Sequence, residues 1–321
     1  MKRVRIPGTD LDVSALCYGL ASFGTSVRGE AADRLYAAYR EAGGCFFDTA
    51  HCYSFWAEGG LGASERALGD CLRRHADRSQ VVVATKGGHP DGGPGYRRPD
   101  HYLAPEVIAS DVAESLDRLG VDRIDLYYLH RDDPRVPVGE VLDALNAEIA
   151  SGRVRHLGAS NWSVARIAEA NGYATAHGLR GFVASQPQWS LAHPNAEPPK
   201  ADPAMRFLMD EDVHWHATQQ IAVVPYSSTA RGYFATDGEA ARDAYDNSVS
   251  RARLERAQQL ASRLGCTPGQ VALAYLMCQS FPVIPVLGTL KVPHLEEDLA
   301  AGCVRLTLEQ VRWLREGEAS T

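Results

Sequence analysis

The segment IDLYYLH (124–130) is apolar or aromatic almost throughout and ends in a histidine. A strand with one face in water would alternate apolar and polar residues, so this run predicts a strand that is buried on both faces. Such strands are typical of parallel sheets covered by helices. The segment therefore predicts an α/β fold.

Seven further short segments have the same character and predict strands: SALCYG (14–19), CFFD (45–48), VVVATK (81–86), VRHLGAS (154–160), GFVASQ (181–186), AVVPY (222–226) and VIPVLG (283–288). Between them, apolar residues recur at helical spacing, which predicts helices at 31–42, 64–74, 105–119, 138–150 and 165–177. Thr267 and Thr307 are each followed three residues later by Gln, the pattern of a helix capping box.

Eight strand–helix repeats predict a (β/α)8 TIM barrel that occupies residues 1–321 as a single domain. A short N-terminal β-hairpin around RIPGTDLDV (5–13) is expected to precede the barrel. Three long connections, 87–104, 187–203 and 227–250, follow predicted strands. They should lie at the C-terminal face of the barrel, where long loops commonly build a substrate site.

The composition narrows the class of protein. The chain has 321 residues and a net charge of -7 without a basic block, which argues against nucleic-acid binding. It shows neither the apolar core of a signal peptide nor an apolar run long enough to span a bilayer. Seven scattered cysteines without a CxxC pair suggest reduced thiols in a cytoplasmic protein, with no metal site.

Three consecutive predicted strands end in Asp48, Lys86 and His130, and Tyr53 follows the first of them. Catalytic residues of TIM barrels lie at these strand ends. A buried Lys86 needs a counter-charge, which Asp48 can provide. A cation beside Tyr53 should lower the pKa of the phenol from about 10 and make it a general acid. With His130 donating to a substrate oxygen, the group can protonate an oxygen as negative charge builds on it.

A carbonyl oxygen that gains a proton requires a hydride at its carbon, and other strand ends suit a nicotinamide cofactor. Ser160, Asn161 and Gln186 offer hydroxyl and carboxamide groups to an amide, and Tyr226 offers a flat ring. The segment PVLGTLKVPHLEEDLAA (285–301) leads from a strand into a helix start that can bind phosphate. The chain has no G-x-G-x-x-G motif, so a Rossmann-type site is not expected.

Along almost its whole length the chain resembles the aldo-keto reductase family. The motifs that carry the resemblance, in family order and spacing, are FFDTAHCYS (46–54), GASERALGDCL (62–72), VATKGG (83–88), IDLYYLHRDDP (124–134), GRVRHLGASNWS (152–163), SQPQWSLA (185–192), VPYSSTARGYF (224–234) and VLGTLKVPHLEEDLAA (286–301).

The resemblance implies a barrel that binds NADP(H), or less often NAD(H), in extended form. It implies a catalytic tetrad with Tyr53 as acid and base, Lys86 and Asp48 as its tuning pair, and His130 as the orienting group. It also implies a set of cofactor-binding residues: Ser160, Asn161 and Gln186 at the carboxamide, Tyr226 against the ring, Ser227, Thr229 and Arg231 along the pyrophosphate, and Gly288, Thr289, Lys291, His294, Glu297 and Asp298 around the adenosine 2'-phosphate.

This sequence departs from the family pattern in the phosphate-binding stretch. Many relatives have Arg where Leu290 or His294 stands here, and Asn where Asp298 stands. A missing Arg removes a bidentate phosphate partner, although Lys291 and Thr289 can still serve. We therefore expect NADP(H) as the cofactor and leave NAD(H) open.

Phe23, Trp56, Trp162 and Trp189 are expected to line the substrate pocket with Tyr53. Aromatic walls suit sugars and apolar carbonyls equally well. The expected activity is an NADP(H)-dependent reductase of an aldehyde, ketone or keto-sugar, of the alcohol dehydrogenase or carbonyl reductase type. Two alternatives stay open: a redox-sensing auxiliary protein with slow turnover, and a sugar dehydrogenase or epimerase that keeps its cofactor tightly bound. The substrate and the oligomeric state are left open as well.

Overall fold

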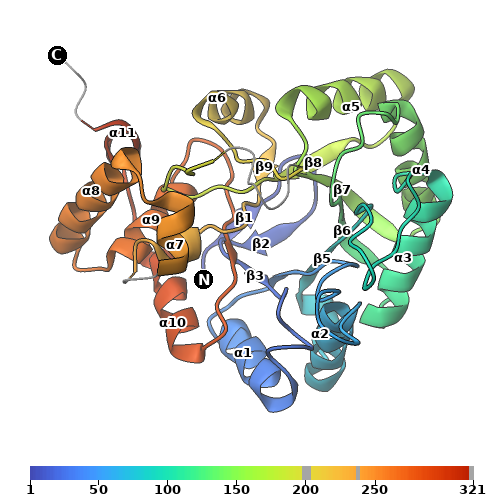
Figure 1. Ribbon diagram of the computed structural model, residues 1–321, viewed down its shortest axis with the longest axis horizontal. Helices are drawn as coiled ribbons and strands as arrows, with labels where there is room; N and C mark the ends of the chain where they lie inside the picture. Colours follow the sequence, from blue (N-terminus) through green and yellow to red (C-terminus); the bar gives the residue numbers. More distant parts are fainter. Residues whose placement is uncertain (197–203, 236–238, 318–321) are drawn as a thin grey trace.

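Eight parallel strands form one sheet that curls into a barrel (Figure 1), in a computed structural model that describes residues 1–196, 204–235 and 239–317. The strands are β3 (Cys17–Gly19), β4 (Phe46–Asp48), β5 (Val82–Gly87), β6 (Ile124–Leu129), β7 (Val154–Ser160), β8 (Phe182–Gln186), β9 (Ala222–Val223) and β10 (Val286–Leu287). Their spatial order is β10-β3-β4-β5-β6-β7-β8-β9. A parallel bridge between Val223 and Val283 joins the two ends of this series.

All eight predicted strands are confirmed, and three of them are clearly shorter than predicted. The strand expected at 14–19 is regular only over Cys17–Gly19. The strand expected at 222–226 ends at Val223, and the one expected at 283–288 is regular only over Val286–Leu287. Pro225 interrupts the segment 222–226, and Pro285 interrupts the segment 283–288. Proline has no N–H to donate to the ladder, which accounts for the shortening of these two strands.

Helices cover the outside of the barrel (Figure 1). They are α1 (Gly29–Glu41), α2 (Ala63–His75), α3 (Pro105–Leu119), α4 (Val138–Ala150), α5 (Val164–His177), α6 (Asp210–Gln219), α7 (Glu239–Tyr245), α8 (Ser248–Leu264), α9 (Pro268–Met277), α10 (Val292–Ala300) and α11 (Leu308–Glu316). Short 3-10 turns lie at Arg78–Gln80, Ala230–Gly232 and Ala301–Cys303. The five predicted helices correspond to α1–α5, and both predicted capping boxes are present at α9 and α11.

One predicted loop is partly helical. The connection expected at 227–250 contains α7 and the first turn of α8. The Asn247 side chain caps α8 by accepting a hydrogen bond from the backbone N–H of Ser250. Asn247 belongs to a residue type that is also common in turns, but here it is the N-cap of a helix. The parts of the long connections at 197–203 and 236–238 lie outside the described residues.

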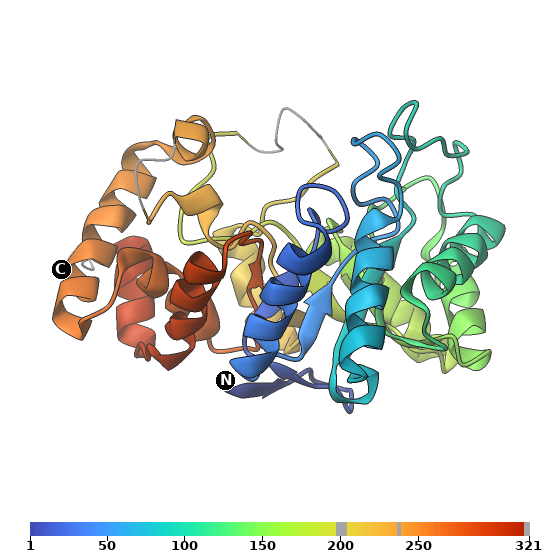
Figure 2. The same cartoon turned by 90° about the horizontal axis from the view of Figure 1, so that it is seen from below.

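The N-terminal hairpin closes the bottom of the barrel. Strands β1 (Arg3–Arg5) and β2 (Asp12–Ser14) pair antiparallel, with Gly8 at a positive φ in the turn, as predicted. The hairpin side chains Ile6, Leu11 and Val13 pack against residues of the barrel interior, such as Phe46. Figure 2 shows the hairpin at one end of the barrel and the long loops at the other. Any open site at the strand ends must therefore lie on the loop side.

The barrel interior is filled tightly at Gly158 on β7. Gly158 pairs with Tyr128 on β6, and a Cβ atom on Gly158 would lie 2.3 Å from the Tyr128 ring. The Tyr128 side chain is fully buried in the interior, so it has little room to move. A glycine at this position allows a large aromatic side chain to fill the centre of the barrel.

We expect Gly158→Ala to lower the free energy of unfolding by about 1–3 kcal/mol, because the added methyl group overpacks the interior. The matched control is Gly172→Ala in α5, where an added Cβ has no neighbour within 4 Å. That change should raise stability by about 0.5–1 kcal/mol, since Ala favours a helix over Gly. Urea denaturation measures both variants. Equal effects of the two substitutions would contradict this account of the interior.

Candidate active site

The ammonium group of Lys86 lies at the centre of the polar strand ends. Its Nζ donates to Asp48 Oδ2 at 2.7 Å, to the backbone oxygen of Thr49 at 2.8 Å and to the Tyr53 hydroxyl at 2.8 Å. Asp48 and Lys86 are almost completely buried on the adjacent strands β4 and β5. Burial alone would lower the pKa of Lys86, but Asp48 and Tyr53 raise it well above its usual range. The lysine is therefore a fixed cation.

His130 follows β6 and faces the same phenol. Its ring lies edge-on to the Tyr53 ring, with 5.7 Å between the centroids. Burial, assisted by the nearby charge of Arg131, holds the pKa of His130 well below its usual range, so the imidazole is neutral. The structure thus brings together the four residues that the sequence placed at the ends of β4, β5 and β6 and in the loop after β4.

The expected lowering of the Tyr53 pKa is wrong for this structure. Burial is the largest influence and raises the pKa of Tyr53 to about 12, although the Lys86 charge acts in the expected direction. The Asp48 carboxylate adds to the rise. Lys86 is itself neutralised in part by Asp48, which the sequence argument treated only as a partner of the lysine. The phenol keeps its proton at neutral pH.

The carboxamide group of Gln186, at the end of β8, is held on one side only. Its Nε2 donates to Asp48 Oδ1 at 2.9 Å, while its Oε1 is buried without a hydrogen-bond partner. Asn161 lies beside it and accepts a hydrogen bond from the Tyr226 hydroxyl at 2.8 Å through Oδ1. Ser160 donates to the backbone oxygen of Gln186 at 2.9 Å. An unpaired buried acceptor is costly unless a ligand supplies a donor.

Two cavities meet at Tyr53 and Tyr226. The larger, of about 750 Å³, is lined by Asp48, Tyr53, Tyr226 and all the residues expected around the pyrophosphate and the adenosine phosphate: Ser227, Thr229, Arg231, Gly288, Thr289, Lys291, His294, Glu297 and Asp298. The smaller, of about 360 Å³, is lined by Lys86, His130, Ser160, Asn161 and Gln186 as well as Tyr53 and Tyr226. Tyr53 therefore stands where the larger cavity, called the groove below, meets the smaller, compact pocket.

The far end of the larger cavity combines a helix N-terminus with both signs of charge. Lys291 is the N-cap residue of α10, and no side chain caps the free N–H groups of that helix. Thr289 donates a hydrogen bond to the Asp298 carboxylate, and burial raises the pKa of Asp298. An anion can bind at such a helix start beside Lys291. The unpaired Gln186 Oε1, the groove and this helix start together fit a nicotinamide dinucleotide.

The expected aromatic lining of the substrate pocket needs correction. Trp56 does line the smaller cavity, and it is 62% exposed. Phe23, Trp162 and Trp189 are instead buried in hydrophobic clusters, where their rings pack against those of Tyr18, Phe182 and Tyr275. The position of an aromatic residue after a strand does not specify the direction of its side chain. The rings of these three residues point into the hydrophobic packing around the barrel.

The structure adds five residues to the smaller cavity that the sequence argument did not assign to a pocket: Cys52, Phe55, His89, Arg131 and Met205. Phe55 packs edge-on against Trp56, with 5.4 Å between the ring centroids. Four of the five could have been found from the sequence. Cys52, Phe55 and Arg131 are each next to a predicted site residue, and His89 lies two residues after the end of β5. Met205 had no such signal.

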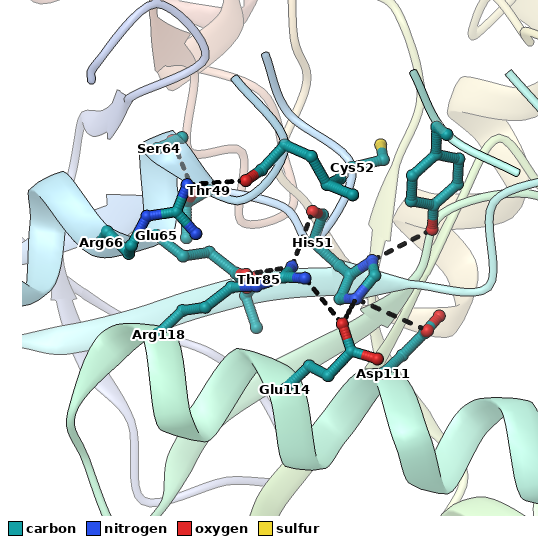
Figure 3. A network of polar contacts seen from close by, with 12 residues as sticks. Thr49, His51, Cys52, Ser64, Glu65, Arg66, Thr85, Asp111, Glu114 and Arg118 are labelled. Carbon is teal, nitrogen blue, oxygen red and sulfur yellow. Dashed lines mark hydrogen bonds and ion pairs between the residues drawn. The ribbon is translucent and has the colours of Figure 1, made fainter. Parts of the chain in front are cut away.

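A buried polar network holds the loop that carries Tyr53 (Figure 3). The His51 imidazole contacts the Tyr96 hydroxyl and Glu114 Oε2, each at 3.0 Å. Its backbone N–H donates to the Lys86 oxygen at 2.8 Å, and its backbone oxygen accepts from Arg118 at 3.1 Å. These contacts at His51, two residues before Tyr53, fix the loop against β5 and α3.

Across 1–196, 204–235 and 239–317, no three His, Cys, Asp or Glu side chains gather in a way that would hold a metal ion. No helix in this part of the chain has the length and apolar character needed to cross a membrane.

An α/β barrel with a buried polar group and a dinucleotide-sized groove at the C-terminal ends of its strands is typical of an oxidoreductase. The sequence model of the Aldo/keto reductase family matches residues 15–318. The chain therefore belongs to the aldo-keto reductase family.

Individual relatives agree with this assignment. The chain is 31% identical over 328 residues to norsolorinic acid reductase B of Aspergillus parasiticus, covering 95% of this chain and 81% of that protein. It is 31% identical over 283 residues to probable aldo-keto reductase 1 of Glycine max, covering 83% and 73%. The crystal structure of the thermostable aldo-keto reductase Tm1743 with the inhibitor epalrestat superposes with a TM-score of 0.73 at 21% identity, covering 99% of this chain and 100% of that one. This last likeness shows the fold.

We expect Asp48→Asn and Lys86→Met each to lower the free energy of unfolding by about 3–5 kcal/mol, because each leaves the other group buried without its partner. The double variant should lose clearly less than the sum of the two. Urea denaturation of all four proteins gives the coupling energy. Strictly additive losses would contradict the pairing. The control cycle uses the exposed pair Asp70 and Arg73 on α2, where Asp70→Asn and Arg73→Met should change stability by less than about 1 kcal/mol.

Proposed function

We propose that this protein is an NADP(H)-dependent oxidoreductase that reduces an aldehyde, ketone or keto-sugar to an alcohol, with Tyr53 as the general acid. The observation that carries the proposal is the position of Lys86 Nζ, which donates hydrogen bonds to both Asp48 and Tyr53. Tyr53 borders both cavities, the groove that fits a dinucleotide and the compact pocket. A proton donor is thus available where the two compartments meet.

Residues of this chain provide a partner for each part of the cofactor. Ser160, Asn161 and Gln186 would hold the carboxamide, and the unpaired Gln186 Oε1 would accept a hydrogen bond from its NH2 group. Tyr226 would stack on the ring, Ser227, Thr229 and Arg231 would contact the pyrophosphate, and Gly288, Thr289, Lys291, His294, Glu297 and Asp298 would surround the adenosine end. When bound, the reduced nicotinamide supplies the hydride.

Tyr53 supplies the proton. As negative charge builds on the carbonyl oxygen, the phenol donates its proton to that oxygen and becomes a phenolate. Lys86, 2.8 Å away, stabilises this phenolate, and its attraction acts mainly after the proton has left. The raised pKa of Tyr53 keeps the proton in place before reaction. His130, which is neutral, would orient the carbonyl oxygen by a hydrogen bond.

The pocket favours a substrate with an apolar or aromatic body. Phe55, Trp56 and Met205 line it together with Tyr53, Lys86 and His130. Several relatives are named reductases of norsolorinic acid, which supports the reductive direction for this chain.

We extend the proposal to the whole chain as one domain, residues 1–321, because its helices pack against the barrel strands in continuous hydrophobic clusters. All seven cysteines are free thiols. This supports a reducing compartment, such as the cytoplasm, as the place of action.

We expect Tyr53→Phe to lower kcat for carbonyl reduction by at least about 100-fold, because the proton donor is lost. NADPH binding, followed by the change in nicotinamide fluorescence, should stay within about threefold of the original, since the phenol is not proposed to hold the cofactor. The control is Tyr173→Phe on α5, a half-buried tyrosine that lines neither cavity, which should leave kcat unchanged. A fully active Tyr53→Phe variant would rule out Tyr53 as the acid.

The pH dependence provides a second check on Tyr53. Its raised pKa keeps it protonated at neutral pH, so the rate of reduction should be flat across the neutral range. Alcohol oxidation requires the phenolate, so its rate should rise with pH. A reduction rate that increases with alkaline pH would contradict this assignment.

We expect Lys291→Met to weaken NADPH binding by about tenfold and to leave NADH binding nearly unchanged, because the exposed ammonium would contact only the 2'-phosphate. Fluorescence titration with each cofactor measures the effect. Lys2→Met, at the far end of the barrel, is the matched control and should bind both cofactors like the original protein. An equal loss for NADPH and NADH would show that Lys291 does not read the 2'-phosphate.

A further inference from the structure

A contact between Cys52 and His130 has no part in the chemistry described so far. The thiol sulfur of Cys52 lies 3.3 Å from Nδ1 of the His130 imidazole. Both side chains are buried and both line the smaller cavity beside Tyr53. The contact therefore involves the imidazole that is proposed to orient the substrate, through its Nδ1 atom.

The backbone on both sides of this contact is fixed. The N–H of His130 donates to the Gly87 oxygen at 2.7 Å, and the His130 oxygen accepts from Asn161 Nδ2 at 3.2 Å. Cys52 follows His51, which is held by the polar network of Figure 3, and the Cys52 backbone oxygen accepts from the N–H of Phe55 at 3.1 Å. These backbone hydrogen bonds therefore hold the two side chains in fixed positions relative to each other.

The sulfur and Nδ1 lie within hydrogen-bond distance, and the direction of this bond depends on the tautomer of the imidazole. Burial raises the pKa of Cys52 to about 12, so the sulfur is a thiol, and burial lowers the pKa of His130, so the imidazole is neutral. Either the thiol donates to Nδ1 or an Nδ1–H group donates to sulfur. The imidazole nitrogen is the better acceptor of the two atoms, because sulfur accepts only weakly. Among the described residues, Nε2 makes no hydrogen bond to the protein.

We propose that Cys52 is a positioning residue that donates its S–H to His130 Nδ1 and thereby selects the tautomer with the proton on Nε2. This inference rests on the proposed function. With Nδ1 occupied as an acceptor, the only N–H of the neutral ring is Nε2–H, which can donate to a carbonyl oxygen in the pocket. The opposite tautomer would turn a nitrogen lone pair toward that oxygen and repel it.

The tautomer can be read directly by 15N NMR of protein labelled at histidine, without cofactor and at neutral pH. The His130 signals are identified as those missing from His130→Gln. We expect Nδ1 of His130 to show the shift of an unprotonated nitrogen and Nε2 that of a protonated one. In Cys52→Ala the two nitrogens should move toward a mixture of both tautomers, and Cys52→Ser should restore the original pattern, because a hydroxyl also donates.

Kinetics supply the matched readout. We expect Cys52→Ala to lower kcat for carbonyl reduction about five- to tenfold, the loss of one hydrogen bond, while the affinity for NADPH stays constant. Cys52→Ser should recover most of this loss. The control is Cys71→Ala, a similarly buried thiol in α2 away from the tetrad, which should leave kcat unchanged. A loss of packing alone would affect Cys52→Ala and Cys71→Ala alike.

An Nδ1–H tautomer in the original protein would overturn the proposal. So would a Cys52→Ala variant that keeps both the single Nε2–H tautomer and the original kcat. If Cys52→Ala does not fold, the spectra of the original protein and of Cys52→Ser still decide. The NMR result needs no turnover, so a protein without reductase activity would refute the proposed function and leave the tautomer question separately answered.

Discussion

The ion pair between Lys86 and Asp48 is the interaction on which the proposed site depends. A buried ammonium group is tolerated only with a charged partner and further hydrogen-bond acceptors. Here Asp48 supplies the charge, and Thr49 and Tyr53 supply the remaining acceptors. The Asp48 carboxylate also accepts a hydrogen bond from the Gln186 amide. One buried ion pair thus links the tetrad to the side of the site that is proposed to bind the carboxamide. Loss of either charge would therefore disturb both compartments.

The barrel provides the close spacing that this pair requires. Strands β4, β5 and β6 are adjacent and parallel, so their C-terminal ends bring Asp48, Lys86 and His130 to one rim. Tyr53 does not belong to a strand. Its position depends on a loop that is held by the His51 network, with acidic and basic partners on α2 and α3. The helices outside the barrel thus contribute to the placement of the phenol inside the site.

Much of the fold and the tetrad could be predicted from the sequence, because both follow from local patterns. Apolar runs such as 124–130 identify buried strands, and polar residues at their ends mark the functional rim. The helices that the sequence did not predict, α6, α7 and α8, are rich in polar and charged residues, so their local composition resembled that of loops. Gly158 is a similar case, because its role depends on a tyrosine from the neighbouring strand.

The sequence by itself determined the class of fold, the order of the strands along the chain and the identity of the polar residues at their ends. Apolar strand segments, the helical segments between them and the residue types at strand ends are all local features of the chain. Only the tertiary structure decided how those residues behave. It placed Phe23, Trp162 and Trp189 in hydrophobic packing and left Trp56 at the pocket. It also raised the pKa of Tyr53, since burial outweighs the attraction of Lys86. Side-chain direction and desolvation depend on every neighbouring element, so no single segment of the chain specifies them.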